Sequence, residues 1–307
     1  MAMYLEHFGL QERPFSLTPD TQFFLNGQSH RQALNTMLLS LSHSEGFIKI
    51  VGEVGTGKTI LCRKLLASLD SRYLTAYVPN PYLTPDELKS YLAGEIGAQL
   101  TDDMKAHQVM FSIYRRLIQL ARRDKRVVLI IDEAQAMPVE TIEALRLLTN
   151  LETEKRKLVQ VVLLGQPELD DLLNRPDLRQ LKQRIVFSEY LKPFSWKGVK
   201  TYLDYRLNAA GATEKVFSSP AVWLIYKGSG GIPRLMNVIA HKAMMLAYGQ
   251  GDKKVKARHV AKAIVDTDES SRIGKFYALR WRLLWPVVGA VTATLCILLP
   301  QWLGGAL

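Results

Sequence analysis

The fold of this chain is decided by the stretch FIKIVGEVGTGKTILC, residues 47–62. Its first five residues form a short, mostly apolar run that predicts a buried strand, and residues 60–69 carry apolar side chains at helical spacing. Between them, Gly52–Thr59 fits the pattern G-x-x-x-x-G-K-[ST] in the strand-to-helix context that a phosphate-binding loop requires. A glycine-rich turn without a ligand is the alternative, and the flanking strand and helix argue against it.

This loop predicts a site for ATP and Mg²⁺. The glycines let backbone N–H groups wrap around phosphates, and the N-terminus of the following helix favours negative charge. Lys58 would place a positive charge on the β- and γ-phosphates, and the Thr59 hydroxyl would ligate Mg²⁺. The predicted nucleotide-binding residues are Gly52, Glu53, Val54, Gly55, Thr56, Gly57, Lys58, Thr59 and Ile60.

Two further segments place polar residues at the ends of predicted buried strands. VVLIIDE, residues 127–133, ends in Asp132 and Glu133. Beside a phosphate loop, Asp132 can hold Mg²⁺ directly or through water, and Glu133 can orient and polarise the attacking water. VQVVLLG, residues 159–165, is followed by Gln166, whose amide would face the γ-phosphate if this strand lies beside the first one. Solvated carboxylates at a strand end and a plain turn residue are the respective alternatives.

The pattern along the chain predicts an α/β fold, with a parallel sheet covered by helices on both faces. Strands are expected at 47–51, 73–78, 126–132 and 159–165, with a possible fifth at 185–187. Helices are expected at 29–41, 60–69, 105–123 and 139–151. Another helix is expected to begin at the capping box of Thr84. After Pro193 only helices are expected, at 195–208, 219–227, 233–248 and 257–266, as in a small helical domain.

The C-terminal stretch Leu283–Leu303 predicts a single transmembrane helix. It has 21 residues and none is charged, so as a helix it would span about 32 Å, close to the roughly 30 Å of a bilayer core. Trp285 and Trp302 stand near its ends, and Arg272, Lys275, Arg280 and Arg282 precede it, which would keep the preceding domains in the cytoplasm. A buried core helix or a surface amphipathic helix is the alternative, which Pro286 and Pro300 favour.

Composition narrows the class of protein. The chain has 307 residues, 48% of them hydrophobic, which excludes wholesale disorder, and its two cysteines exclude a disulfide framework. Its net charge of +11 fits nucleic acid, an anionic membrane or a phosphorylated ligand. Basic clusters at 122–126, 155–157 and 253–258 are either solvated faces or contacts to DNA, lipid headgroups or an acidic partner.

The motifs together resemble an AAA+ ATPase. GEVGTGKT, LIIDEAQ and LLGQPEL occur in this order, followed by LRQLKQRI and GGIPRLMN. More narrowly, the chain resembles the A-protein family of the general (type II) secretion pathway, nearest its branch for MSHA type IV pilus biogenesis (M protein). The opening Tyr4-Leu5, Phe8-Gly9-Leu10, Pro14-Phe15 and Leu17-Thr18-Pro19-Asp20 is similar to that family's start, and the resemblance covers about residues 3–268.

The resemblance implies a domain plan and roles for further residues. The plan is an N-terminal segment and first helix at 1–45, an AAA+ core at 46–193, a helical lid at 194–268, a basic linker at 269–282 and the membrane helix at 283–303. Gln166 would be sensor 1, where many AAA+ proteins have Asn. Arg184, or else Arg179, would be the arginine finger, and Arg234 would be sensor 2. A finger acting across subunits implies a homo-oligomer, expected to be a ring.

These expectations lead to one main functional hypothesis and one alternative. The main hypothesis is an ATPase anchored in a bacterial inner membrane, with its ATPase domain in the cytoplasm, that works with other proteins to assemble a type IV pilus or a type II secretion apparatus. Secretion-pathway members continue into a periplasmic, peptidoglycan-binding region, and only residues 304–307 follow the span here, which favours the shorter pilus branch. The alternative is a DNA-associated AAA+ ATPase resembling transposition helpers or replication initiators. A small-molecule kinase is disfavoured because Asp132-Glu133 suits water activation.

Overall fold

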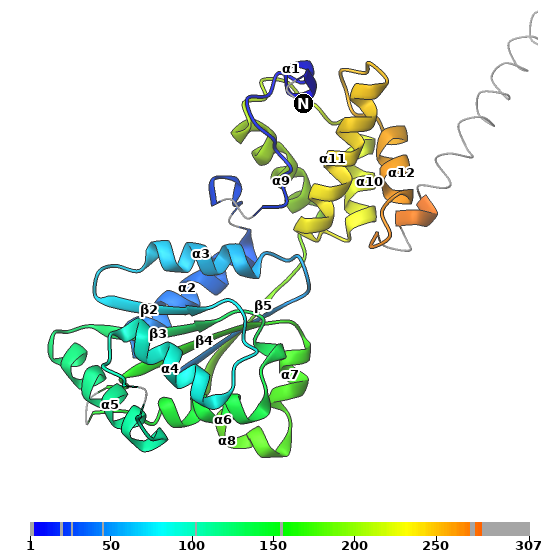
Figure 1. Ribbon diagram of the computed structural model, residues 1–307. Helices are drawn as coiled ribbons and strands as arrows, with labels where there is room; N and C mark the ends of the chain where they lie inside the picture. Colours follow the sequence, from blue (N-terminus) through cyan, green and yellow to red (C-terminus); the bar gives the residue numbers. More distant parts are fainter. Residues whose placement is uncertain are drawn as a thin grey trace, which may run out of the picture. The chain divides into compact units, whose positions relative to one another are not determined.

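The computed structural model describes residues 3–18, 21–25, 27–44, 46–101, 103–153, 156–270 and 274–277. They form two compact units, drawn in Figure 1: a sheet unit, Asn26–Lys192, and a helical unit, made of Met1–Leu25 and the chain from Pro193 onward. The prediction from the sequence keeps residues 1–45 together, whereas the structure divides this segment between the two units. The segment is divided because its aromatic residues and its first long helix bury their apolar sides against different cores.

The sheet unit has five parallel strands in the order β2-β3-β4-β1-β5. The strands are β1 (Phe47–Gly52), β2 (Tyr73–Val78), β3 (Arg126–Ile131), β4 (Val159–Gly165) and β5 (Ile185–Leu191). All seven residues of β4 are buried, as expected for a strand covered on both faces. The predicted parallel α/β class is thus confirmed, and β4 pairs with β1 as the sequence suggested.

β5 is longer than the predicted 185–187 because it is an edge strand. Its side chains alternate between half-buried and exposed, so polar residues such as Ser188 and Glu189 interrupt the apolar pattern that marks the central strands. Glu189 also accepts hydrogen bonds from Gln32 and Thr36 of the neighbouring helix α2 (Gln28–Ser42). The strand extends to Leu191 because its residues pair with β1 as far as Gly52, a long-range pairing that local hydrophobicity does not show.

Helices cover both faces of the sheet. Figure 1 shows α2 (Gln28–Ser42) and α3 (Lys58–Ser68) on one face, and α4 (Pro85–Ile96), α5 (Ala106–Arg122) and α6 (Val139–Leu148) on the other. The predicted capping box at Thr84 is present, with Glu87 N–H donating to Thr84 Oγ1 over 3.3 Å. The remaining short helices are η2 (Ala134–Ala136), α7 (Glu168–Leu173), η3 (Pro176–Leu178) and α8 (Arg179–Lys182).

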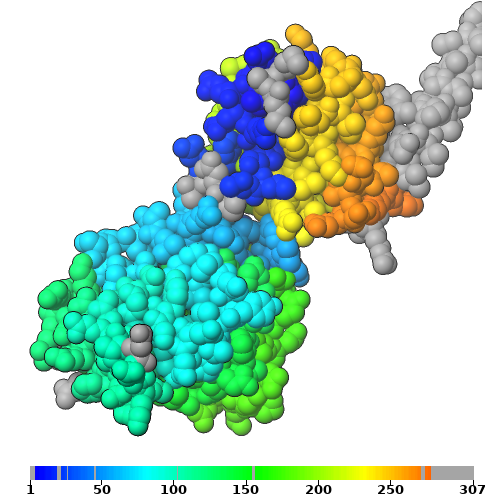
Figure 2. Space-filling view, viewed as in Figure 1, coloured from blue at the N-terminus to red at the C-terminus, as the bar shows by residue number. Residues whose placement is uncertain are grey.

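The helical unit contains α9 (Trp196–Ala209), α10 (Ser219–Ser229), α11 (Pro233–Gly249) and α12 (Ala257–Val265). The N-terminal helices α1 (Met3–His7) and η1 (Thr21–Phe23) join it, and Figure 2 shows the blue N-terminal residues against the yellow α11. The buried side chains of Tyr4, Phe8, Leu10, Phe15 and Phe23 belong to the same core as α9–α12. Because these aromatics bury a large apolar area, they hold the N-terminal segment on the helices.

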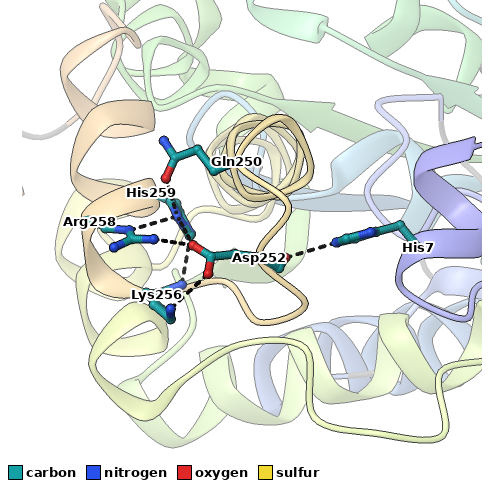
Figure 3. Close-up of polar contacts among 6 residues, drawn as sticks. All are labelled: His7, Gln250, Asp252, Lys256, Arg258 and His259. Carbon is teal, nitrogen blue, oxygen red and sulfur yellow. Dashed lines mark hydrogen bonds and ion pairs between the residues drawn. The ribbon is translucent and has the colours of Figure 1, made fainter.

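A polar network around Asp252 also ties the N-terminus to this unit (Figure 3). The Asp252 carboxylate accepts from Lys256 Nζ over 2.9 Å and from Arg258, and it lies 3.1 Å from His259 Nε2. Its backbone carbonyl lies 3.0 Å from His7 Nε2 of α1. The hydrogen bond from Lys256, with the charge and hydrogen bond of Arg258, lowers the pKa of Asp252 to about 2.

No helix among the described residues is long and apolar enough to cross a membrane. The predicted span Leu283–Leu303 lies outside those residues, as do Arg272, Arg280 and Arg282. Part of the predicted linker is described: residues 274–277 are helical and pack on α10.

Candidate nucleotide site

The loop between β1 and α3 has the backbone shape that its glycines allow. Gly55 and Gly57 have φ of 79° and 101°, in the left-handed region that favours glycine. At Gly52 the limit is space, because a Cβ there would lie 2.6 Å from Thr56 Oγ1. Gly57 precedes α3 and offers no capping side chain, so the N-terminus of α3 is suited to an anionic ligand.

Lys58 begins α3 and is only 5% exposed. Its ammonium donates to the carbonyl oxygens of Gly52, over 2.8 Å, and Glu53, over 3.3 Å, so its charge lies inside the loop. Burial lowers the pKa of Lys58, opposed by the charges of Glu133 and Asp132. The positive charge therefore faces two carboxylates across the site.

Asp132 follows β3 and is 3% exposed, which argues against a solvated carboxylate at the strand end. Its Oδ2 accepts from Thr59 Oγ1 of α3 over 2.9 Å and from the Tyr77 hydroxyl of β2 over 3.3 Å. A threonine hydroxyl and a carboxylate within one hydrogen bond are oxygen donors of the kind Mg²⁺ prefers. The residues present thus fit a divalent cation.

Glu133 has a left-handed backbone, with φ 51° and ψ 38°. For a non-glycine residue this costs on the order of 1–3 kcal/mol and is typical of functional positions. Its Oε2 accepts from Gln135 Nε2 over 2.7 Å and from Gln166 Nε2 over 2.8 Å. Burial acts to raise the pKa of Glu133, but these two hydrogen bonds and the charge of Lys58 outweigh it and hold the pKa below its usual value.

Gln135 joins the ends of two strands, a role that sequence analysis did not assign. Its Oε1 accepts the backbone N–H of Gln166 over 2.9 Å, while its Nε2 binds Glu133. Both glutamine side chains thus converge on one carboxylate oxygen. The only sequence signal was the letter after Asp-Glu-Ala in the quoted motif, which gives no hint of a contact to β4.

His30 was also missed, because a lone histidine on a helix gives no sequence signal. It lies on α2, is 2% exposed, and its Nε2 lies 2.7 Å from the Thr56 carbonyl oxygen of the loop. Burial lowers its pKa, opposed by this hydrogen bond, so the ring is neutral at pH 7. A neutral ring with a proton on Nε2 donates to the Thr56 carbonyl oxygen and so stabilises the loop against α2.

The three predicted arginines are placed differently. Arg184 precedes β5, is half-buried, and its Nη1 donates to Asn150 Oδ1 and, over 3.5 Å, to the Arg146 carbonyl oxygen. Arg179 is exposed at the start of α8. Arg234 is exposed on the second residue of α11, in the helical unit. Their roles as finger and sensor stay predictions.

Comparisons with known proteins agree with this geometry. Residues 41–173 match the family model described as an AAA domain. Over 255 residues, 82% of the chain, the sequence is 41% identical to general secretion pathway protein A of Aeromonas hydrophila. The chain covers 46% of that relative, so it spans about half of the relative's length.

Solved structures show the same fold at low identity. The ORC2 protein of Aeropyrum pernix, solved as ADPNP-ADP complexes, has a TM-score of 0.62 at 19% identity, covering 85% of this chain and 72% of that one. Cdc6p of Pyrobaculum aerophilum has a TM-score of 0.62 at 20% identity, and the match covers 81% of this chain and 69% of that one. The RuvB motor of Thermotoga maritima has a TM-score of 0.52 at 18% identity, and the match covers 82% of this chain and 72% of that one. The chain thus contains an AAA domain with a P-loop and is related to general secretion pathway protein A.

Proposed function

We propose that Glu133 is the general base that activates water for ATP hydrolysis at this site. The observation that carries the proposal is the convergence of Gln135 and Gln166 on Glu133 Oε2, beside a buried lysine. A carboxylate held ionised by two amides can orient a water and accept its proton. Gln166 would also contact the γ-phosphate, as sensor 1.

The neighbouring residues would bind the nucleotide and its metal. Thr59 and Asp132 would hold Mg²⁺, which would neutralise charge on the phosphate oxygens. Lys58 would leave the loop carbonyls for the β- and γ-phosphates, and the N–H groups of residues 52–60 would bind the phosphate chain. Arg184 of a neighbouring subunit, or else Arg179, would act as the finger in a ring, with Arg234 as sensor 2.

The test is Glu133→Gln, with Glu140→Gln as the matched control on an exposed glutamate of α6. We expect Glu133→Gln to keep nucleotide affinity and to lose about 10²–10⁴-fold in kcat, since only proton transfer is removed. Glu140→Gln should change neither. Nucleotide binding and phosphate release are measured separately, and full turnover in Glu133→Gln would refute the assigned role.

For the cellular role, we propose assembly of a type IV, MSHA-like pilus or a type II secretion apparatus at a bacterial inner membrane. Two observations support it: the 41% identity to a protein named for the general secretion pathway, and the charge-free run Leu283–Leu303. The run would anchor the chain once, with the ATPase in the cytoplasm. Resistance of the full chain to alkaline carbonate washing tests the anchor, and release by the wash would refute it.

A second candidate, DNA-associated ATPase activity, is favoured by the net charge of +11 and by the exposed lysines at 253, 254 and 256. Binding through several phosphates would weaken steeply with salt. A DNA titration at two salt concentrations tests it. Affinity that is weak and insensitive to salt would exclude this candidate and leave the membrane role.

A further inference from the structure

Five aromatic side chains gather on one side of the helical unit around the ammonium of Lys227. We define this aromatic face by Trp196, Trp223, Tyr226, Phe276, Tyr277 and Lys227. The Lys227 ammonium lies 5.6, 5.5 and 5.8 Å from the ring centres of Trp223, Tyr226 and Tyr277. Trp196 lies edge-on to Tyr226 at 6.0 Å, and Phe276 to Tyr277 at 5.8 Å. Three segments far apart in sequence thus build one surface.

The segment 274–277 is held on α10 by a glycine-to-glycine contact. A Cβ at Gly274 would lie 2.4 Å from the Cα of Gly228, so no larger residue fits without displacing backbone. Three residues later, the Tyr277 ring lies edge-on to Trp223 with ring centres 4.9 Å apart. Residues 274–277 therefore have a defined place, at the end of α10.

Much of the aromatic face is open to solvent. Phe276 is 58% exposed and Trp196 is 37% exposed. Lys197 and Lys200, on the same helix as Trp196, are also exposed. Clustered exposed aromatics with cations are unusual on a surface that contacts only water. Amphipathic rings with lysines are typical of the headgroup layer of a membrane, where the rings enter the interface and the cations meet anionic lipids.

Chain connectivity limits how far this face can be from a bilayer. From Tyr277 to Leu283, the first residue of the charge-free run, there are six residue steps, which span at most about 20 Å when fully extended. If the run enters a membrane at Leu283, Tyr277 of the aromatic face lies within about that distance of the lipid.

We propose that the aromatic face docks on the headgroup layer of an anionic bilayer. The proposal rests on the membrane anchoring proposed above and goes beyond it, because it says which side of the helical unit meets lipid. Trp196 and Phe276 would enter the interface, and the neighbouring lysines would contact phosphate headgroups.

The basic loop between α11 and α12 is the competing surface, and it lies at the other end of α10. Ser218 N–H, just before α10, donates to the Val255 carbonyl oxygen over 3.0 Å, whereas Gly274 packs on Gly228 near its last residue. Ten helical residues separate the two contacts, about 15 Å along the axis. Asp252 of that loop also pairs with two neighbouring cations, Lys256 at the end of the loop and Arg258 in the first turn of α12.

The experiment uses the full chain with Cys296→Ser, since burial raises the pKa of the remaining Cys62 to about 12 and makes it unreactive. A bimane label is attached to Phe276→Cys or, as the matched control, to the exposed Lys254→Cys. The chain is reconstituted into vesicles of phosphatidylcholine and phosphatidylglycerol that contain a nitroxide-headgroup lipid. ATP hydrolysis confirms that each labelled chain is folded.

We expect emission at 276 to fall about twofold or more, with no change at 254, since the interface extends only a few ångströms around the headgroups. If the chain resists carbonate washing but the emission of the label at 276 is not quenched, the proposed docking of the aromatic face is wrong, whereas the membrane anchor still stands. A 276 label shielded from aqueous iodide without lipid quenching also overturns it, because a protein then covers the face. Release of the chain from the vesicles by the carbonate wash would refute both the membrane anchor and the docking of the aromatic face. The proposed ATPase activity would not be affected by that result.

Discussion

One carboxylate of the helical unit and the two carboxylates of the nucleotide site are held in opposite ways. In the helical unit, Asp252 is paired with cationic donors, Lys256 and Arg258. At the nucleotide site, the described side chains that donate to Asp132 and Glu133 are neutral: a threonine, a tyrosine and two glutamines. Neutral donors fix a carboxylate without cancelling its charge. The first arrangement stabilises a loop, whereas the second keeps negative charge available for a metal ion and for a proton.

The largest effect expected from this contrast is that of Lys58→Ala. It removes a buried cation that interacts with Asp132 and Glu133, and we expect a loss of about 2–5 kcal/mol in nucleotide affinity, roughly 30- to 5,000-fold. Lys64→Ala, on the same helix, is the control. Titration with a fluorescent nucleotide measures both, and unchanged affinity in Lys58→Ala would contradict the placement of the site.

Loss of the arginine finger should lower ATP hydrolysis only in the assembled oligomer. Arg184→Ala is expected to lower kcat by about 10³-fold, the low end for such fingers, because the γ-phosphate charge loses its cation. Activity of the unaltered chain should rise with protein concentration, and mixing Arg184→Ala with Lys58→Ala should restore part of it. Arg179→Ala is the parallel variant. Turnover that is independent of concentration, with no rescue, would place the finger in cis or exclude it.

Gln135→Ala tests whether neutral donors matter at the nucleotide site. It removes one hydrogen bond to an ionised carboxylate, worth about 1.5–3 kcal/mol, so we expect kcat to fall roughly 10- to 150-fold. Nucleotide affinity should not change, because Gln135 contacts Glu133 and Gln166 rather than the loop. Gln135→Glu should not rescue turnover, since its carboxylate cannot donate to Glu133. A matching fall in affinity would indicate a structural role instead.

Asp252→Asn should affect the helical unit alone. The amide cannot compensate the charges of Lys256 and Arg258, so we expect this unit to melt a few degrees lower while nucleotide affinity is unchanged. Asp86→Asn is the control, since Asp86 is an exposed residue of α4 that pairs with the half-buried Lys89. Calorimetry reports the melting temperature, and a shift confined to the sheet unit would contradict the role of the Asp252 network.

The smallest expected effect is the pH dependence from His259. Burial and the charge of Arg258 lower its pKa, so below about pH 6.5 the unfolded chain binds a proton that the folded chain resists. Stability should therefore fall as the pH decreases below 6.5. His259→Gln should reduce this slope, leaving the parts that come from His241 and His30, whose pKa values burial also lowers. An identical slope in His259→Gln would show that His259 does not contribute.

The sequence by itself determined the central strands, the phosphate loop and Asp132-Glu133, because each is encoded in a short continuous run. Burial on both faces makes β1, β3 and β4 read as apolar, and the loop needs glycine at fixed positions. The sequence also predicted that Gln166 follows a strand paired with β1, and the structure confirms this pairing, while the role of Gln166 as sensor 1 stays a prediction.

Only the tertiary structure decided that Gln135 joins Gln166, that His30 braces Thr56, and that the N-terminal aromatics belong to the helical unit. His30 lies 26 residues from Thr56, and Gln135 lies 31 residues from Gln166. Phe15 reaches Phe217 from about two hundred residues away, with ring centres 5.9 Å apart. Such contacts depend on how separate elements pack, and no local period or spacing in the sequence encodes that packing.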